Sequence, residues 1–266
     1  MVEIHSYKRK MKTLTLHKKE GYTIVQLNRG KVNAINLEMV NELSAVFHEL
    51  EDDVQTKGVI LTGIPYFFSA GLDLIELIGY DRPQMNHFFE SFAALYAQLL
   101  RFQKPLIAAI TGHSPAGGCV LAVACDNRYM AEGEKFRIGL NEVAVNVQIS
   151  QDLTEIYAFW LGKGVAHRYV LEGKLLTTQE AQNAGLVDEV VPMDEVLPRA
   201  EKQMQLYLRA DQEIWTNTKR KLRKRLLLGL ESNPAEAMKE AADLWWKPEI
   251  RNKMEAYVQS FSTKKK

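Results

Sequence analysis

The sequence predicts an α/β fold in which buried strands alternate with helices and pair largely in parallel. Two short apolar runs, residues 59–61 and 106–110, are bounded by glycine or proline and have the length of buried strands. Apolar residues recur at helical spacing in residues 37–51, which precede the first of these strands, and in residues 85–101, which precede the second. Strands that are separated by helices need crossover connections, so parallel pairing is expected.

The N-terminal part begins with two strands and a helix. Residues 14–16 and 22–27 alternate apolar and polar side chains, with a turn expected at Glu20 and Gly21. Asn36 is the expected N-cap of the helix at residues 37–51. The apolar positions of that helix are Met39, Val40, Leu43, Val46, Phe47 and Leu50.

The middle of the chain continues the alternation of helices and strands. The helix at residues 85–101 leads through Pro105 into the buried strand at residues 106–110, which ends before Gly112. Further elements are expected at residues 116–125 (a short buried helix) and at residues 127–130 and 135–138 (two strands).

The chain changes character after Pro198, because residues 199–261 read as successive helices without strand signals. We therefore predict an α/β core over residues 1–198, which holds the ligand sites, and a helical C-terminal region over residues 199–266. The basic run at residues 219–225 is interpreted as a solvated helix face, with a phosphate-contacting surface as the alternative. Trp245 and Trp246 are expected to pack against the core or a neighbouring subunit.

Composition excludes several classes of protein. The 266 residues are 46% hydrophobic and 25% charged, as in an ordinary soluble domain, and the net charge of +1 gives no field for nucleic acid or acidic membranes. No apolar stretch reaches the roughly 18 residues of a membrane span. Residues 1–12 lack the apolar core of a signal peptide, and the sequence ends in three lysines, so a cytoplasmic location is expected.

Cysteines and histidines carry no metal or disulfide pattern. Cys119 and Cys125 lie six residues apart in one apolar run, where a disulfide would fit poorly, so both are expected as reduced core thiols. The histidines are scattered without paired ligand spacing, and no metal site is predicted.

Two loops indicate where negative charge can be held. Residues 68–74, with the sequence FSAGLDL, follow a buried strand and contain small residues that let the backbone approach a ligand, although a simple turn before a helix looks the same. Residues 111–119, with the sequence TGHSPAGGC, again lead from a buried strand through glycines into an apolar helix, whose first N–H groups lack intrahelical acceptors. One N–H group from each loop would together form an oxyanion hole.

One carboxylate, Glu142, follows in the segment IGLNE and can move a proton beside that charge, unless it is a helix-cap or salt-bridge residue at the surface. A second carboxylate would be useful at position 120, but Val120 is apolar. His113 is interpreted as structural. This combination indicates an enzyme that shifts protons on an activated acyl group.

In chain order, the segments FSAGLDL, SPAGGC, CDNRY and IGLNE resemble those of the crotonase (enoyl-CoA hydratase/isomerase) superfamily. The sequence around Gly117 and Glu142 is most similar to the mitochondrial-type Δ3,Δ2-enoyl-CoA isomerase branch. The resemblance, over roughly residues 12–200, implies a spiral of ββα turns with a helical C-terminal trimerisation region, and a homotrimer or homohexamer. It also implies a coenzyme A thioester, so that coenzyme A belongs to the substrate and no separate cofactor is expected.

The resemblance also implies roles for individual residues. The oxyanion donors would be the backbone N–H groups of Leu72 and Gly117, and the base would be Glu142. Residues 31–36 resemble the loop beside coenzyme A in that family. The implied substrate-binding set is Lys31, Asn33, Ala34, Ala70, Asp73, Leu74, Gly118 and Val120.

In the resembled hydratases, two glutamates activate a water molecule, and one of them stands three residues after the second oxyanion glycine. That position is Val120 here, so the sequence favours an isomerase of fatty-acid β-oxidation, in which Glu142 moves a proton from C2 to C4. Residues 143–152 are more polar than in the isomerase branch, and Asp152 or Glu155 can supply a second acid. The alternatives are another crotonase-type enzyme (a hydratase, decarboxylase or thioesterase) and a non-catalytic acyl-CoA-binding protein.

Overall fold

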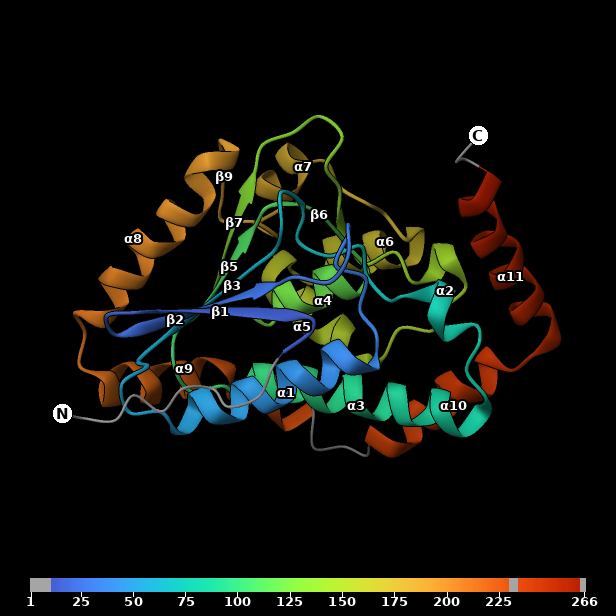
Figure 1. Ribbon diagram of the computed structural model, residues 1–266, viewed down its shortest axis with the longest axis horizontal. Helices are drawn as coiled ribbons and strands as arrows, with labels where there is room; N and C mark the ends of the chain where they lie inside the picture. The colour runs from blue at the N-terminus through green and yellow to red at the C-terminus, as the bar shows by residue number, and fades with distance from the viewer. Residues whose placement is uncertain (1–10, 230–233, 264–266) are drawn as a thin grey trace.

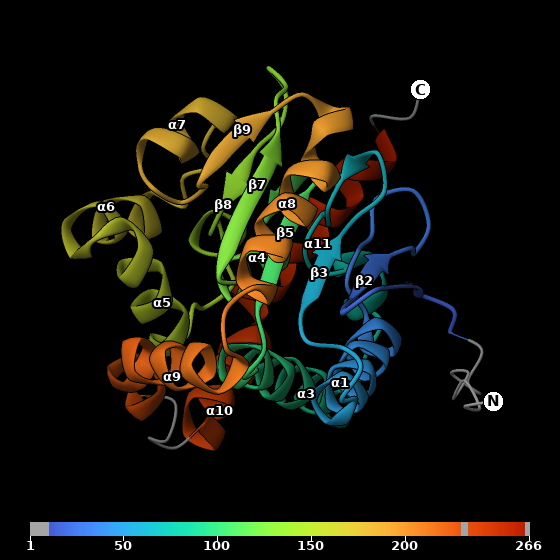
Figure 2. The same cartoon turned by 90° about the vertical axis from the view of Figure 1, so that its left-hand side faces the viewer.

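The computed structural model describes residues 11–229 and 234–263, which form two sheets surrounded by helices (Figures 1 and 2). The larger sheet has the order β1-β2-β3-β5-β7-β9 and the smaller one has the order β4-β6-β8. Among the strands of the described residues, β1 and β2 pair antiparallel as a hairpin, and the other neighbouring strands pair in parallel. The strands are β1 (Leu14–Lys19), β2 (Tyr22–Leu27), β3 (Val59–Thr62), β4 (Tyr66–Phe67), β5 (Leu106–Ile110), β6 (Gly112–Pro115), β7 (Asn127–Ala131), β8 (Ile138–Gly139) and β9 (Glu189–Val191).

Three successive units repeat one pattern: a strand of the larger sheet, a strand of the smaller sheet, then a helical segment. The units start at β3, β5 and β7, and they confirm the predicted spiral of ββα turns. The helices are α1 (Leu37–Asp52), α2 (Leu74–Leu77), α3 (Arg82–Arg101), α4 (Gly117–Val123), α5 (Gln151–Leu161), α6 (Lys163–Glu172), α7 (Thr178–Asn183), α8 (Val196–Leu208), α9 (Gln212–Gly229), α10 (Pro234–Trp245) and α11 (Pro248–Thr263), with 3-10 turns η1 (Val143–Val145) and η2 (Met193–Glu195).

Capping residues determine where helices α1 and α3 begin. The side chain of Asn36 accepts a hydrogen bond from Met39 N at 3.1 Å, so the predicted N-cap of α1 is confirmed. Helix α3 begins three residues before the predicted start at residue 85, because Asp81 and Gln84 form a reciprocal capping box.

The predicted strand at residues 135–138 is wrong except for its last residue, since β8 contains only Ile138 and Gly139. Phe136 N donates to Gly133 O at 3.2 Å, which makes the preceding residues a turn. Strand β8 pairs in parallel with Ser114 and Pro115 of β6, and Ile138 also bridges Leu176.

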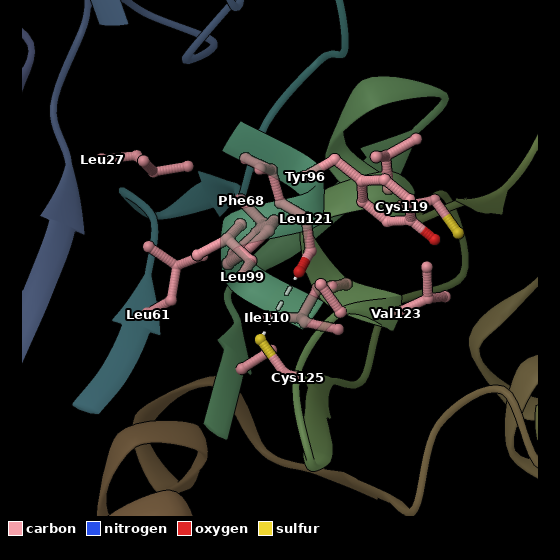
Figure 3. Packing of buried hydrophobic residues seen from close by; sticks show 14 of the residues in the cluster. Leu27, Leu61, Phe68, Tyr96, Leu99, Ile110, Cys119, Leu121, Val123 and Cys125 are labelled. Atoms are coloured by element: carbon pink, nitrogen blue, oxygen red, sulfur yellow. Dashed lines mark hydrogen bonds between the residues drawn. The ribbon is translucent and has the colours of Figure 1, made fainter. Parts of the chain in front are cut away.

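The core contains both cysteines as free, buried thiols, which confirms the prediction (Figure 3). Helix α4 lies inside this core, where Leu121 and Val123 are fully buried, and it packs against α3. None of the helices within residues 11–229 and 234–263 is long and apolar enough to cross a membrane.

The predicted helical C-terminal region starts with α8, which crosses the larger sheet over β3, β5 and β7 (Figure 2). Tyr22 and Tyr129 of the sheet donate hydrogen bonds to Glu201 and Gln203 of α8, at 2.8 and 3.2 Å. The boundary at residue 198 stays a prediction, but α8 packs as a covering layer of the sheet. Trp245 of α10 is 3% exposed and packs edge-on against Phe89 of α3, with ring centroids 5.9 Å apart.

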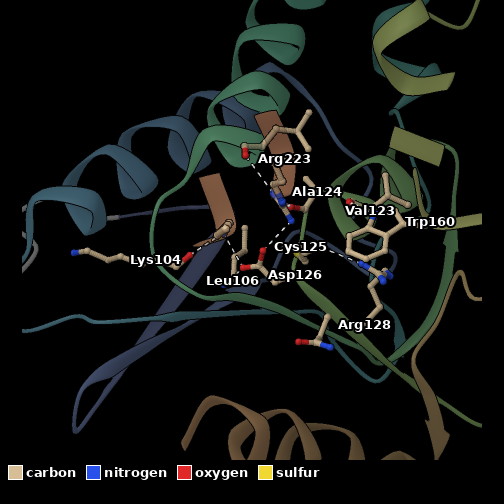
Figure 4. Close-up of polar contacts among 12 residues, drawn as sticks. Lys104, Leu106, Val123, Ala124, Cys125, Asp126, Arg128, Trp160 and Arg223 are labelled. Atoms are coloured by element: carbon tan, nitrogen blue, oxygen red, sulfur yellow. Dashed lines mark hydrogen bonds and ion pairs between the residues drawn. The ribbon is translucent and has the colours of Figure 1, made fainter. Parts of the chain in front are cut away.

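The basic run of α9 is not a uniformly solvated face. Lys219 and Arg223, one turn apart, are buried on the same side and both pair with Asp126, at 2.7 Å to Oδ2 and 2.9 Å to Oδ1. Figure 4 shows Arg223 beside Asp126. The interpretation as a solvated face is therefore wrong for these two residues and holds for the exposed Arg220, Lys221, Lys224 and Arg225. A buried cation needs such a partner to offset its desolvation.

Replacing Asp126 with alanine is expected to destabilise the fold by about 3–5 kcal/mol, because it leaves two buried cations without their counter-ion. Urea unfolding measures this difference. Lys224→Gln removes an exposed cation of the same run and is the control, expected to change stability by less than about 0.5 kcal/mol. A loss below about 1 kcal/mol for Asp126→Ala would contradict the prediction.

Candidate active site

One large cavity, of about 1320 Å³, brings the sequence-predicted loops together. Its wall takes residues from the loops before α2 and α4, from α3, and from the segment 141–153. The predicted site residues that line it are Glu142, Leu72, Gly117, Ala34, Ala70, Asp73, Leu74 and Val120.

Two backbone N–H groups from different loops lie close together in this wall. Ile35 N donates to Gly71 O at 2.8 Å and Asp73 N donates to Ile35 O at 2.9 Å, which fixes the segment around Leu72. The N–H groups of Leu72 and Gly117 have no acceptor among the residues that the structure describes. A methyl group on Gly117 would stand 3.4 Å from Leu72 N, which shows how near the two loops approach. The pair has the composition of an oxyanion hole.

The close approach depends on small residues in both loops. Gly71 has φ +85°, and a Cβ there would lie 3.1 Å from Pro115 O and 3.4 Å from Gly117 N. Ala116, directly before Gly117, has φ 45° and ψ −119°, a conformation that residues with a Cβ rarely adopt. The backbone next to one candidate donor is therefore strained, at a cost of order 1–3 kcal/mol.

Glu142 is the buried carboxylate of this cavity. Its side chain follows β8 at the start of η1, it is 8% exposed, and its Oε2 atom has no hydrogen-bond partner in the described part of the chain. Burial raises the pKa of Glu142 to about 7. A carboxylate with this pKa can both take and return a proton near neutral pH. Asn141, which sequence reasoning missed, lines the cavity beside Glu142 and also has an unpartnered buried oxygen, Oδ1, among the described residues.

Comparison with known proteins identifies the family of this site. The sequence profile of the Enoyl-CoA hydratase/isomerase family matches residues 17–266. The chain belongs to the enoyl-CoA hydratase/isomerase family. The mouse protein "Enoyl-CoA delta isomerase 1, mitochondrial" is 32% identical over 246 residues, which is 92% of this chain and 85% of that protein.

Relatives with a different reaction are equally similar in sequence. The "2,3-dehydroadipyl-CoA hydratase" of Escherichia coli is 34% identical over 195 residues, 71% of this chain and 73% of that protein. The crystal structure of human mitochondrial delta3-delta2-enoyl-CoA isomerase superposes with a TM-score of 0.92 and 28% identity, covering 96% of this chain and all of that one. The likeness thus places the chain among enzymes of this family, but it does not identify the reaction, which has to be inferred from the residues of the site.

Three predicted binding residues lie outside the cavity wall of this hydratase/isomerase-family chain: Lys31, Asn33 and Gly118. Asn33 is fully buried at φ 50°, donates to Leu27 O and Phe68 O, and accepts from Arg29 N at 2.8 Å. Its polar atoms are thus used to hold the loop. Lys31 is exposed beside it.

Gly118 allows the two loops to lie close together, because a Cβ at this position would lie only 2.7 Å from Ser69 O. Asp73 lines the cavity and also caps α2, accepting from Glu76 N at 3.1 Å. It pairs with Arg29 at 2.7 Å. Sequence reasoning missed Arg29, which also binds Glu76 at 2.9 Å and fixes the start of α2.

The first turns of α5 place one of their two acids in the cavity wall. Asp152 lines the wall and burial raises its pKa, with nearby Arg101 opposing the rise. Glu155, one turn later, is exposed and lies outside the wall. His113 is also outside the wall, with its ring between those of Phe67 and Phe136 at 5.2 and 5.4 Å.

Sequence reasoning missed two parts of the wall. The first is one face of α3, where Phe89, Ala93, Tyr96 and Ala97 recur at helical spacing and make an apolar surface. The second comes from the C-terminal helices, which contribute Glu240 and Ala241 of α10 and Tyr257 of α11. The cavity wall thus extends beyond the predicted core of residues 1–198, because α10 and α11 contribute to it.

Proposed function

We propose that the protein is a Δ3,Δ2-enoyl-CoA isomerase that moves a double bond into conjugation with the thioester. The observation that carries the proposal is the combination of one buried carboxylate, Glu142, with two converging N–H groups and an apolar residue, Val120, at the position of the second glutamate of hydratases. The isomerase names among the relatives support it.

The proposed reaction uses these groups in order. The thioester oxygen accepts hydrogen bonds from Leu72 N and Gly117 N, and Glu142 takes a proton from C2 of a 3-enoyl group. The C2–H electron pair passes to the thioester oxygen as an enolate. The enolate re-forms the carbonyl, the double bond moves from C3–C4 to C2–C3, and C4 takes the proton back from Glu142. The acyl chain would lie along the apolar face of α3, with the pantetheine along Ala34, Ala70, Asp73 and Leu74. A homotrimer or homohexamer and a cytoplasmic location stay predictions.

Incubation of the purified protein with a 3-enoyl-CoA, followed by ultraviolet absorbance of the conjugated thioester, tests the proposal. Appearance of the 2-enoyl-CoA band supports an isomerase. A second arm starts from a 2-enoyl-CoA, where loss of the band by hydration would instead support the hydratase alternative, which the Escherichia coli relative represents. Activity in neither arm over several chain lengths would favour another acyl-CoA reaction or a binding protein.

We expect Asp152→Asn to keep more than about a tenth of the wild-type kcat for isomerisation, because the proposal gives the whole proton transfer to Glu142, whereas loss of a working acid or base costs about 100-fold or more. Glu155→Gln on the same helix lies outside the cavity and is the matched control. A loss of about 100-fold confined to Asp152→Asn would show a two-acid mechanism.

A further inference from the structure

Three side chains from three different elements bind the C-terminal end of α4, on consecutive carbonyl groups. Trp160 Nε1 of α5 donates to Val123 O at 2.9 Å, Arg223 Nη1 of α9 donates to Ala124 O at 3.0 Å, and Arg128 Nη1 of β7 donates to Cys125 O at 3.0 Å (Figure 4). Trp160, Arg223 and Arg128 are called the α4 clamp below. The end of a helix leaves such carbonyls without intrahelical partners, so each donor finds a free acceptor.

The clamp uses two buried cations, whereas a helix end needs only hydrogen-bond donors. Arg128 is fully buried, its guanidinium lies 3.7 Å from the ring centroid of Trp160, and its Nε donates to Leu186 O at 2.6 Å. Arg223 is 3% exposed and pairs with Asp126, and it donates a further bond to Leu100 O at the end of α3. Buried cations cost several kcal/mol in desolvation, whereas many helix ends are satisfied by a backbone motif instead.

The N-terminal end of α4 carries Gly117, so contacts that fix the C-terminal end of this short helix also fix the position of Gly117. The helix has seven residues, so Gly117 and Val123 are only about 9 Å apart along its axis, and the helix moves as one body. The direction of the Gly117 N–H is set by the peptide between Ala116 and Gly117, which is held at the strained φ 45° and ψ −119° of Ala116. Such strain persists only where the surroundings over-determine it.

We propose that Trp160, Arg128 and Arg223 are positioning residues for the reaction: they hold α4 so that the strained Ala116–Gly117 peptide keeps the Gly117 N–H aimed beside the Leu72 N–H. The inference rests on the proposed function only for its use of these two N–H groups on the thioester oxygen. It applies to any reaction of the family that stabilises an enolate there.

The first test variant is Trp160→Phe, which removes the indole N–H and keeps an aromatic ring over Arg128. We expect kcat for isomerisation to fall about 10- to 100-fold, since a displacement of about 1 Å can cost 100-fold. The KM and the Kd for a saturated acyl-CoA should change much less than kcat, because the acyl and pantetheine walls are not altered and only the hydrogen bonds to the thioester carbonyl are weakened. Trp246→Phe is the matched control, since Trp246 Nε1 has no hydrogen-bond partner among the described residues and its side chain lies outside the cavity wall.

Infrared spectroscopy measures the hydrogen bonds to the thioester oxygen in a bound ligand, independently of turnover. The infrared carbonyl band of a bound 2-enoyl-CoA, labelled with carbon-13 at C1, moves to lower frequency when two N–H groups bind the oxygen, and Trp160→Phe should reverse part of that shift. A second variant, Arg223→Lys, keeps the charge opposite Asp126 but not the planar fork that bonds two carbonyls, and should act in the same direction.

The outcomes separate the two proposals. If the wild type does not isomerise a 3-enoyl-CoA but the carbonyl shift is present and weakened by Trp160→Phe, the proposed function fails and the clamp stands. If Trp160→Phe and Arg223→Lys lower the melting temperature while kcat per folded molecule and the carbonyl band stay at wild-type values, the clamp is merely structural and the inference is overturned.

Discussion

Replacing Glu142 with glutamine is expected to lower kcat for 3-enoyl-CoA isomerisation by about 1,000- to 10,000-fold, the upper part of the range for general acid–base groups. In the proposal the same carboxylate takes the proton from C2 and delivers it to C4. The glutamine side chain can do neither, so both proton transfers are lost in the variant. Glutamine has nearly the same shape, and Glu142 makes no ion pair in the described part of the chain, so the affinity for the CoA thioester should stay close to that of the wild type.

Glu90→Gln is the control for this variant, because Glu90 also lines the cavity but is exposed on α3. It should keep the wild-type rate. Steady-state kinetics with the conjugation assay and calorimetry with a saturated acyl-CoA separate turnover from binding. Glu142→Gln with more than about a tenth of the wild-type kcat would remove Glu142 as the base and move the proton transfer to another group, with Asp152 as the first candidate.

The same carboxyl gives a pH dependence of activity and of stability. Activity requires the ionised base, so kcat/KM of the wild type should rise with pH through about 7, the pKa to which burial raises Glu142. In the unfolded chain the carboxyl titrates near 4.5, so between pH 4.5 and 7 the unfolded state loses its proton first. Ionisation therefore disfavours folding as pH rises, by an amount of the order of 3 kcal/mol above pH 7.

Glu142→Gln removes this penalty. The variant should match the wild type in stability below pH 4.5 and exceed it above pH 7, as measured by urea unfolding across that range. Equal stability at all pH values would mean that the folded carboxyl titrates at its ordinary pKa. A catalytic group that lowers stability in its working form is typical of active sites.

Local pattern was sufficient for much of the fold and for the two loops of the site. Strands β3 and β5 are short apolar runs with clear boundaries, and the glycines around position 117 mark a backbone that approaches a ligand. The strand at residues 135–138 was overestimated because the Phe136 N to Gly133 O bond makes the preceding residues a turn, which leaves Ile138 and Gly139 to pair with β6. Periodicity also cannot show which face of α3 meets a cavity.

The features of the fold and of the site that the sequence did not reveal depend on contacts between segments that are distant in sequence. Lys219 and Arg223 look like part of a charged surface until the fold brings Asp126 between them, 93 and 97 residues away in sequence. Tyr257 lines a cavity whose other walls come from residues before 154, from Leu175, and from Glu240 and Ala241 of α10, so its own sequence neighbours do not indicate the site. Asn33 looked like a ligand contact because its loop is at the site, yet its side chain is used by the loop itself.

The second large effect is expected for Gly117→Ala, with a loss of about 100- to 1000-fold in kcat, the cost of losing one oxyanion donor. The new methyl group would lie 3.4 Å from Leu72 N and 3.1 Å from Ile35 Cδ1, in the space where a thioester oxygen must reach both N–H groups. Backbone conformation does not forbid the change, because Gly117 has no positive φ and starts a helix in which alanine is favourable. The variant should therefore fold, bind coenzyme A thioesters more weakly only through their carbonyl, and fail in the chemical step.

Gly164→Ala is the matched control for this methyl group. Gly164 lies in α6, and a Cβ there meets nothing closer than Arg168 Nη1 at 4.0 Å, so the same addition enters open space. It should leave kcat unchanged and raise stability by about 0.5–1 kcal/mol through helix propensity. If Gly117→Ala folds, binds a saturated acyl-CoA and still turns over at more than about a tenth of the wild-type rate, the Gly117 N–H does not hold the thioester oxygen. The charge of the enolate would then have to be stabilised by Leu72 N together with a different donor, for which the side-chain amide of Asn141 lies in the same wall.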